Sequence, residues 1–457
     1  MKNILNKIDL LNNKKAKLNA VLAVMAFLMM LCLKTALTMR TANWYAPTII
    51  GGCGLTGILM FLVYRKNSSR ISKSGIFIVA MEIIIGFSFL LNGLAMSVKS
   101  YCFIGAVFMI LLPLMHFFFA THDQEKLMQR FCMTLALSYI IMLVVNMFRG
   151  PVLVKFQYGA IMGNSNLLGN YLIALIPALV YLLLKKKDAS FKNKAICWGL
   201  LVSAVTMLVF TSSRTSVIAL FFAIGYLLVT AFISRGKGKK REFKKQHVIT
   251  VIIITVTVPF IMFFMLSTVR KELIILERKL FTNNSKTAAK DDEDLETDFN
   301  LDYYIKGLDG EGEDNFTSGR IIIWKDFTKN LSIMGHESEY REIKEETRTY
   351  EHANAHNVYL QVGYSAGIAA GAAYLMTVVF IGVKALILFA RSVAKKKKYD
   401  LELLLSFSFF IGFAIFSLTA DGYMIFNYFP ATLFWFTAHN YMYKNKQENE
   451  KETIETE

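Results

Sequence analysis

Four short polar clusters interrupt an otherwise apolar sequence, and they carry the side chains best suited to chemistry. The clusters are residues 163–166, residues 211–214, residues 318–320 with Trp324, and residues 356–361. An arginine binds anionic oxygens through charge-assisted, often bidentate hydrogen bonds, and a neutral histidine accepts a proton from a hydroxyl group at pH 7. Arg214 and Arg320 are therefore candidate anion ligands, and His356 is a candidate general base.

The composition indicates what kind of protein must position these clusters. Hydrophobic residues make up 54% of the 457 residues, and charged residues make up 19%. A soluble domain has about 45–50% apolar residues even with glycine counted, and about 25% charged residues. The apolar residues also occur in blocks of about 20, the length that spans a bilayer as a helix. The sequence therefore predicts an all-α polytopic membrane protein and excludes a chain of soluble domains.

We predict about twelve transmembrane helices. They are expected near 19–38, 45–64, 75–97, 102–120, 131–148, 166–184, 195–211, 215–233, 247–266, 368–390, 401–419 and 423–441. The apolar run 195–233 would form a single helix of about 59 Å, twice the thickness of the hydrocarbon core. We therefore expect a helical hairpin that turns at the polar stretch 211–216. The resulting parts are 1–266 with helices 1–9, an extracytoplasmic loop at 267–356, 357–441 with helices 10–12, and a tail at 442–457.

The basic residues orient these helices. Alternate short loops and the two termini on one side hold 31 lysines and arginines, whereas the short loops of the other side hold 5. Because basic loops stay on the cytoplasmic side, both termini are expected in the cytosol of a bacterial plasma membrane. The formal net charge of +17 is then explained by topology and by contacts with membrane lipids, and we expect no nucleic-acid partner.

The large loop 267–356 is expected on the outer face. It holds 13 basic and 20 acidic residues, and long loops in compact proteins are usually functional. Ser318 is the expected N-cap of a short amphipathic helix that includes Trp324 and lies on the membrane surface. The apolar run 358–390 would be about 50 Å long as one helix, so its first two turns should stand above the bilayer with His356 at the interface.

Each cluster also has a purely structural interpretation. Asparagine and glycine at 163–166 suit a capped helix start, Arg214 could extend to the membrane interface, and Arg320 could be an exposed loop residue. A single histidine such as His356 is often structural. The setting of Arg214 favours a functional role, because this residue lies between two apolar helices without an acidic neighbour in sequence. A guanidinium group held there needs an anion.

We expect no metal and no other cofactor. His352 and His356 have the i, i+4 spacing that suits zinc, but no glutamate follows His352 and the sequence offers no evident third ligand. All five cysteines fall in apolar blocks, where cysteine usually acts as a small buried hydrophobic residue.

In type and order, the four clusters resemble those of the O-antigen ligase and Wzy-type polysaccharide polymerase superfamily of bacterial membranes. The matching segments are Gly163-Asn164-Ser165-Asn166, then Thr211-Ser212-Ser213-Arg214, then Ser318-Gly319-Arg320 with Trp324, then His356-Asn357 with Tyr359 and Gln361. The large loop before the histidine matches as well. The resemblance covers roughly residues 160–375, and the first five helices match only in hydropathy.

Two positions depart from the ligase pattern. That pattern has histidine-asparagine, nine residues, and then two glycines separated by two residues; Gly367 fits, but Ala370 occupies the second glycine position. The family turn also often has proline where Ser165 stands. Both differences weaken a ligase assignment more than an assignment to the superfamily, so a polymerase is favoured.

The resemblance implies an inverting, metal-independent glycosyltransferase of the GT-C type. Its donor would be a glycan on undecaprenyl diphosphate, and its acceptor a hydroxyl of a lipid-linked repeat unit of a capsule, exopolysaccharide or O-antigen. Arg214 and Arg320 would bind the diphosphate, and His356 would activate the acceptor. Substrate contacts are expected from Asn164, Asn166, Ser213, Trp324, Asn357, Tyr359 and Gln361. A flippase and a chain-length regulator are the further expected partners.

Three other functions stay open. A ligase would transfer the glycan to a different acceptor, such as lipid A core. A transporter or flippase of lipid-linked glycan would place charges and broken helices near the bilayer midplane. The charges within the apolar blocks are Lys34, Glu82 and Lys384, which are few and lie away from the four clusters. A non-catalytic assembly subunit is the third.

The topology can be tested with cysteines placed in two loops. In intact cells, the cysteine of Gly312→Cys should react with a membrane-impermeant maleimide, because loop 267–356 is expected outside. The cysteine of Gly238→Cys should react only after permeabilisation, because seven basic residues in 234–246 hold that loop in the cytosol. Labelling of Gly238→Cys but not of Gly312→Cys in intact cells would reverse the predicted orientation.

Overall fold

The computed structural model describes parts of the chain between residues 70 and 444. The described residues are 70–71, 73–113, 116, 124–149, 153–154, 157–160, 165–185, 191–211, 213–233, 320–344, 349–395, 401–418 and 443–444. Most of them are helical, as the sequence predicts. The predicted spans at 19–38, 45–64, 247–266 and 423–441 lie outside the described residues.

The described elements are mainly apolar helices. In chain order the helices are α4 (Lys73–Ala95), α5 (Lys99–Ala106), the π-helix η2 (Val107–Leu111), α7 (Gln124–Arg149), α8 (Ser165–Lys185), α9 (Phe191–Thr211), α10 (Arg214–Ile233), α16 (Arg320–Lys329), α17 (Val358–Ala366), α18 (Ile368–Lys395) and α19 (Leu401–Phe416). The strands form three antiparallel pairs, namely β1 (Arg70–Ile71) with β6 (Tyr443–Lys444), β2 (Leu153–Val154) with β3 (Gln157–Tyr158), and β4 (Arg341–Lys344) with β5 (Thr349–Ala353).

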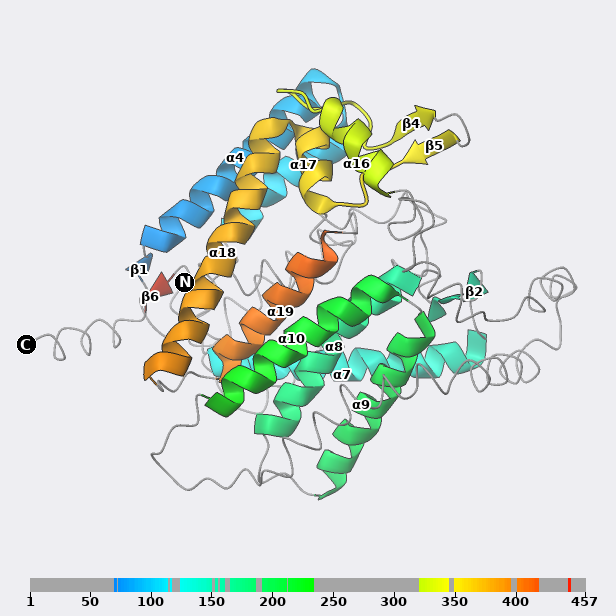
Figure 1. Ribbon diagram of the computed structural model, residues 1–457, viewed down its shortest axis with the longest axis vertical. Helices are drawn as coiled ribbons and strands as arrows, with labels where there is room; N and C mark the ends of the chain where they lie inside the picture. Colours follow the sequence, from blue (N-terminus) through cyan, green and yellow to red (C-terminus); the bar gives the residue numbers. More distant parts are fainter. Residues whose placement is uncertain are drawn as a thin grey trace, which may run out of the picture.

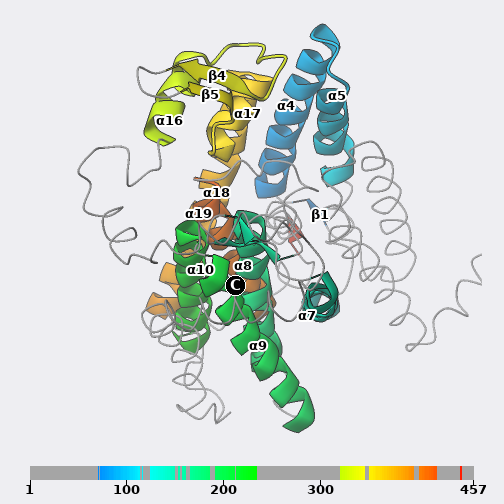
Figure 2. The same cartoon turned by 90° about the vertical axis from the view of Figure 1, so that its right-hand side faces the viewer.

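The helices pack as two groups, and α19 contributes side chains to the cores of both. In one group α4 packs against α5, η2 and α18, and in the other α8 packs against α7, α9, α10 and α19. Figure 1 shows α19 between α18 and α10, with α16, α17, β4 and β5 gathered above the bundle. In Figure 2, α7 is seen nearly along its axis, whereas α9 and α4 are seen lengthwise. Helix α7 therefore crosses its neighbours steeply.

The predicted helical hairpin at 211–216 is present. Helix α9 ends at Thr211 and α10 begins at Arg214, so the chain turns at the polar stretch. Within the described residues, four helices are long and apolar enough to cross a membrane. They are Ser74–Ala95, Ser165–Lys185, Lys194–Thr211 and Ile368–Ile387. Further predicted spans correspond to shorter apolar helices, at Lys99–Ile110, Phe131–Val144, Thr215–Thr230 and Leu401–Phe416.

Exposed apolar side chains cover the outside of the bundle, as expected for helices that contact lipid. On α18, Leu375, Val379 and Leu386 are exposed, whereas Tyr374 and Ile381 on the opposite side are fully buried. Helix α8 is buried on all sides. A helix that is apolar all round belongs in the centre of a bundle, so α8 forms the core against which the second group packs.

One end of the bundle is held by charged residues, and we call it the basic end. The Nζ atom of Lys185, at the end of α8, lies 2.8 Å from Glu125 Oε1 of α7 and 2.7 Å from Glu402 Oε1 of α19. Tyr181 donates a 2.7 Å hydrogen bond to the same oxygen of Glu402. The starts of α7 and α19 and the end of α8 therefore meet, which is the grouping that the loop charges predict.

Above the opposite end lies a small polar head. It consists of α16, α17 and the β4–β5 hairpin, around a core of Ile323, Phe327, Ile343, Ala355 and Tyr364. The helical run predicted at 358–390 is broken at Gly367, which has a left-handed backbone (φ +96°) and caps α17. A Cβ atom at Gly367 would collide with the carbonyl group of Ile333. This break separates α17 from the membrane-length helix α18. The sequence predicted that the first two turns of this run stand above the bilayer, but it predicted neither the break nor the β4–β5 hairpin.

A buried polar pair links α4 to the segment after η2. His116 Nε2 lies 2.5 Å from Glu82 Oε1, and both side chains are completely buried. The sequence identified Glu82 as a charge within an apolar block but did not indicate its partner. Lys384, the other described charge of that kind, lies with its Nζ atom 5.4 Å from the centroid of the Phe380 ring.

The Glu82–His116 pair predicts a non-additive effect on stability. His116→Leu leaves the Glu82 carboxyl group without this hydrogen bond, which costs about 1–3 kcal/mol for a buried polar group. The melting temperature of the detergent-purified protein should fall. The double variant Glu82→Leu with His116→Leu should melt above either single variant, since neither polar group remains. Additive losses would contradict the pairing.

Candidate active site

The starts of α8 and α10 meet at the end of the bundle opposite the basic end. Ser213 Oγ donates a 3.0 Å hydrogen bond to Asn166 Oδ1 and lies 2.8 Å from Ser216 Oγ. Ser213 is buried and Asn166 is exposed. Gly169 allows this close approach, because a Cβ atom there would lie 2.8 Å from the Cβ of Ser216. Two of the four polar clusters are therefore in direct contact.

The end of α19 lies at the same level as the start of α10. The two helices run antiparallel, with Ser408 Oγ donating a 2.8 Å hydrogen bond to the Ala223 carbonyl. Arg214 precedes Ala223 by nine positions, and Ser417 follows Ser408 by nine positions. Since both helices rise about 1.5 Å per residue, the backbone of Arg214 and that of Ser417 reach the same height. We call this end of the bundle the loop end.

The fourth cluster, residues 356–361, is attached to the loop end through α19. Asn357 caps α17, because its Oδ1 accepts hydrogen bonds from the amides of Tyr359 (3.0 Å) and Leu360 (3.2 Å). Its Nδ2 donates to the Leu418 carbonyl at 3.2 Å, and the Val358 amide donates to the Ser417 carbonyl at 2.9 Å. The start of α17, next to His356, is thus joined to the end of α19.

Tyr359 adds a side-chain contact to this joint. Its hydroxyl donates a 3.3 Å hydrogen bond to the Ala414 carbonyl of α19. Burial raises the pKa of Tyr359 well above its usual range, so the hydroxyl stays protonated and remains a donor.

His356 has an uncommon backbone conformation. Its φ is +43°, in the left-handed region, and its side chain is half-buried. Its amide donates a 3.2 Å hydrogen bond to Asn354 Oδ1. A non-glycine residue in this region costs about 1–3 kcal/mol and persists only where its surroundings fix it, as is common at active sites.

The peptide before His356 is bound by two side chains. The Ala355 carbonyl accepts a 2.9 Å hydrogen bond from Trp324 Nε1, and the Ala355 amide donates a 2.8 Å hydrogen bond to Gln361 Oε1. Arg320 begins the helix that carries Trp324 and lies one helical turn before it, on the same face. The third cluster, 318–320 with Trp324, is therefore brought beside the fourth.

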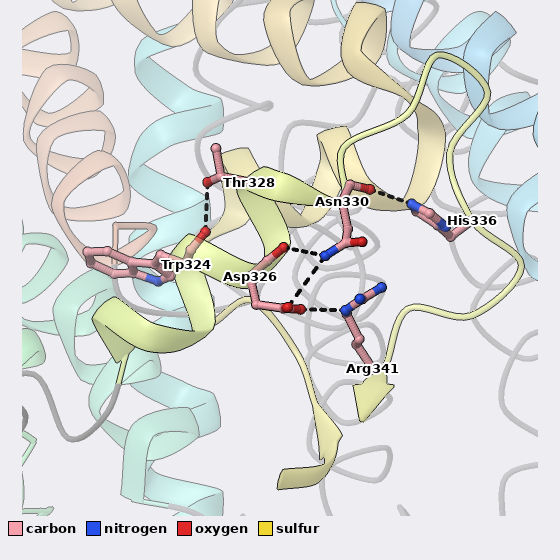
Figure 3. Close-up of polar contacts among 6 residues, drawn as sticks. All are labelled: Trp324, Asp326, Thr328, Asn330, His336 and Arg341. Carbon is pink, nitrogen blue, oxygen red and sulfur yellow. Dashed lines mark hydrogen bonds and ion pairs between the residues drawn. The ribbon is translucent and has the colours of Figure 1, made fainter. Parts of the chain in front are cut away.

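Figure 3 shows how α16 is fixed within the head. Arg341 of β4 forms an ion pair with Asp326, and Asn330 Nδ2 donates a 2.8 Å hydrogen bond to the Asp326 carbonyl. His336 Nε2 lies 2.6 Å from the Asn330 carbonyl, and its ring stacks on Tyr364 with centroids 4.0 Å apart. The short helix α16 thus has partners on β4, on the loop after it and on α17.

The Arg341 guanidinium stays charged in this setting. Burial lowers its pKa, but hydrogen bonds to Tyr364 and Asp326 outweigh that effect and raise the pKa above its usual value. Both partners of the ion pair are partly exposed, with 30% and 28% of their side-chain surfaces accessible. Such a pair contributes about 1 kcal/mol or less to stability, so its main effect is to orient α16.

The expected site residues thus have three different positions. Asn166, Ser213, Asn357, Tyr359 and Gln361 lie at the loop end or on α17, Trp324 and Arg320 lie on α16, and His356 lies between the two groups. Asn164 and Ser318 fall outside the described residues, and of Arg214 the structure describes only the backbone position at the start of α10. The convergence of both guanidinium groups on His356 stays a prediction.

Some supporting residues were missed by the sequence reasoning. Asn92, near the end of α4, is buried and donates hydrogen bonds to the Ser365 carbonyl and, at 3.1 Å, to the His336 carbonyl. It was not singled out, although an asparagine in an apolar block is a usable signal. The roles of Asp326 and Arg341 had no comparable signal, because each becomes meaningful only through its partner.

No group of three or more His, Cys, Asp or Glu side chains that could hold a metal ion occurs among the described residues. The chemistry that these residues offer is anion binding by arginine and proton transfer by histidine. Both would take place at the junction between the apolar bundle and the polar head.

The fold and the site together define a helical membrane protein that carries a polar site at one end of its bundle. Residues 199–375 match the family model Wzy_C, described as O-antigen ligase, and this match confirms the resemblance to the O-antigen ligase and Wzy superfamily. The match begins in α9, ends in α18 and includes Arg214, Arg320 and His356. At family level it supports a membrane glycan transferase. Neither the curated proteins nor the solved structures contain a match.

The close packing of α8 on α10 gives a testable prediction. Gly169→Ala should lower the melting temperature, because its Cβ would meet Ser216 and push apart the helix starts that join Asn166 to Ser213. Ser216→Gly should restore part of the loss by removing the colliding side chain.

Gly199→Ala is the matched control for this change. A Cβ atom at Gly199 has nothing within 4 Å, so the substitution should be neutral or stabilise the protein by up to about 1 kcal/mol. If Gly169→Ala and Gly199→Ala melt alike, the close contact between α8 and α10 is not required.

Proposed function

We propose that this protein is a polymerase of a bacterial surface polysaccharide. It transfers a glycan from undecaprenyl diphosphate to a hydroxyl group of a lipid-linked repeat unit at the outer face of the plasma membrane. The observation that carries the proposal is the position of His356, which is held in a left-handed conformation where the polar head meets the loop end. The family match at 199–375 supports the reaction class.

In this proposal the loop end receives a lipid-linked donor. The lipid chain would lie among the apolar helices, and the diphosphate would reach the level where α10 begins. Arg214, at that start, and Arg320, one turn before Trp324, would bind the diphosphate oxygens. Asn164, Asn166 and Ser213 would contact the diphosphate or the first sugar, since Asn166 and Ser213 are joined at the same level.

The proposed reaction is a direct displacement at the anomeric carbon. His356 accepts the proton of the acceptor hydroxyl as its oxygen bonds to the anomeric carbon of the donor sugar. The bond between that carbon and the phosphate oxygen breaks, and undecaprenyl diphosphate leaves with the electron pair. Attack from the face opposite the leaving group inverts the anomeric centre. The two arginines stabilise the negative charge that develops on the leaving group.

A ligase is the second candidate, because the matching family model is described as O-antigen ligase. The sequence favours a polymerase at one described position. The second glycine of the ligase pattern is replaced by Ala370, which is buried in the first turn of α18. A transporter receives less support. Among the described residues, Glu82 is a buried acidic residue within an apolar block, and its carboxyl group is already hydrogen-bonded to His116.

Removing the proposed catalytic groups should abolish polymer formation while leaving the protein in the membrane. His356→Ala, Arg214→Ala and Arg320→Ala should each reduce the rate of chain growth at least about 100-fold, because each removes a group that acts on the developing charge or the proton. Lys325→Ala is the control, since it removes an exposed positive charge from the same helix as Arg320. Normal polymer from a variant would exclude that residue from the site.

Purified protein in proteoliposomes distinguishes the candidate functions. With lipid-linked repeat units as the only substrate, a polymerase produces longer lipid-linked glycans. A ligase transfers glycan only after a different acceptor is added, and a transporter moves the lipid-linked glycan across the membrane without elongating it. The absence of elongation by the active protein would contradict the proposal.

A further inference from the structure

The backbone around His356 is fixed by side chains rather than by regular secondary structure. Strand β5 ends at Ala353 and α17 begins at Val358, so residues 354–357 lie between two elements. Within this segment His356 adopts φ +43°. Because that conformation costs free energy, neighbouring contacts must compensate for it.

Those contacts are concentrated on one peptide unit. Ala355 is completely buried, so its amide and carbonyl groups have no access to water. The amide is bound by Gln361 Oε1 at 2.8 Å and the carbonyl by Trp324 Nε1 at 2.9 Å. A buried backbone group that loses such a partner is left without any hydrogen bond, which is unfavourable. The two side chains therefore define where the chain enters His356.

Gln361 is itself held rigidly. It is 1% exposed, and its Nε2 donates to the Glu339 carbonyl at 3.0 Å and to Ser365 Oγ at 3.1 Å. Its amide oxygen and amide nitrogen therefore both have partners within the head. The Gln361 side chain therefore connects α17 to the loop before β4 and to the peptide before His356.

Trp324 is held from the other side. It lies in α16, the ten-residue helix Arg320–Lys329. Phe327 of the same helix packs on Tyr364 of α17, with ring centroids 4.6 Å apart. Since α16 begins at Arg320, the bond from Trp324 to Ala355 also holds the start of α16 close in space to the backbone of His356.

We propose that Trp324 and Gln361 are positioning residues that hold His356 in place by binding both polar groups of the Ala355 peptide. This inference rests on the proposed function, in which His356 accepts the proton of the acceptor hydroxyl. It gives Trp324 and Gln361 a role within the protein in place of the substrate contacts expected from the sequence. Displacing a reacting group by about 1 Å can cost about 100-fold in rate without changing substrate affinity.

The test combines amide exchange with steady-state kinetics of the full-length protein in lipid bilayers. Trp324→Phe keeps an aromatic ring but removes the N–H donor, and Gln361→Met removes both polar groups at similar length. Both variants should accelerate hydrogen exchange at residues 354–357 about tenfold or more, because each removes one of the two hydrogen bonds that hold the Ala355 peptide. Both should lower kcat about 10- to 100-fold with KM unchanged, using lipid-linked repeat units as substrate.

Two further variants serve as controls. Gln361→Glu keeps an oxygen for the Ala355 amide and should recover part of the lost kcat relative to Gln361→Met. Thr328→Val removes a hydrogen bond from α16 without touching Ala355 and should behave like the wild type. Hydrogen exchange in α18 is the reference for intact folding. If Trp324→Phe or Gln361→Met also accelerates exchange in α18, the test relies on the other of these two variants.

Each outcome decides the proposal. Unchanged exchange at 354–357 would show that Trp324 and Gln361 do not hold this segment. Faster exchange with unchanged kcat would show that holding the segment does not position His356 for the reaction. A raised KM with unchanged kcat would mean that the two side chains contact substrate instead. Full activity of His356→Ala would reject the proposed catalytic role of His356. The exchange measurements would still show whether Trp324 and Gln361 hold residues 354–357, so the two failures can be distinguished.

Discussion

The joint between α17 and α19 determines where the polar head sits on the bundle. Val358 donates its amide to the Ser417 carbonyl, and Asn357 caps α17 while donating to the Leu418 carbonyl. The last carbonyl groups of a helix lack partners within that helix. Here the carbonyl groups of Ser417 and Leu418, directly after α19, accept hydrogen bonds from the start of α17. This joint therefore connects the end of one helix to the start of another and places His356 at the end of the bundle.

The same constraint explains why the head is tied down at several points. Buried polar groups are costly unless they are hydrogen-bonded. Asn92 of α4 reaches the carbonyls of Ser365 and His336, so the far group of helices is bound to the head as well. Each such bond joins segments far apart in sequence. The head therefore acquires a defined position although only ten residues of α16 and nine of α17 are helical.

Local sequence features predicted the helices well, because hydrophobic length and breaking residues act over short distances. The polar stretch at 211–216 marks the turn between α9 and α10. The excessive length of 358–390 indicated that its first turns stand above the bilayer, although the break at Gly367 itself was not predicted. The β4–β5 hairpin was missed, since its strands are short and largely polar. Partnerships such as Glu82 with His116 were missed for a different reason. They depend on which helices become neighbours, and the spacing within one helix carries no such information.

The candidate site followed the same division. The residue types at 214, 320 and 356 indicated the chemistry, but the sequence could not separate side chains that act on substrate from side chains that hold the backbone. Gln361 and Trp324 look like substrate ligands in a list of polar and aromatic residues. In the structure their hydrogen-bonding groups are bound to Ala355, Glu339 and Ser365.

The extent of the family match bears on how this site is built. Residues 199–375 include all three proposed catalytic residues, whereas helices α4, α8 and α19 lie outside that range. Asn166 binds Ser213, Leu418 binds Asn357, and Asn92 binds Ser365 from these flanking helices. The matched segment thus supplies the groups suited to chemistry, whereas the flanking helices supply the contacts that fix its ends. A site at a membrane surface needs both, because an arginine or histidine on an unsupported loop would be free to turn towards water and away from a lipid-linked substrate.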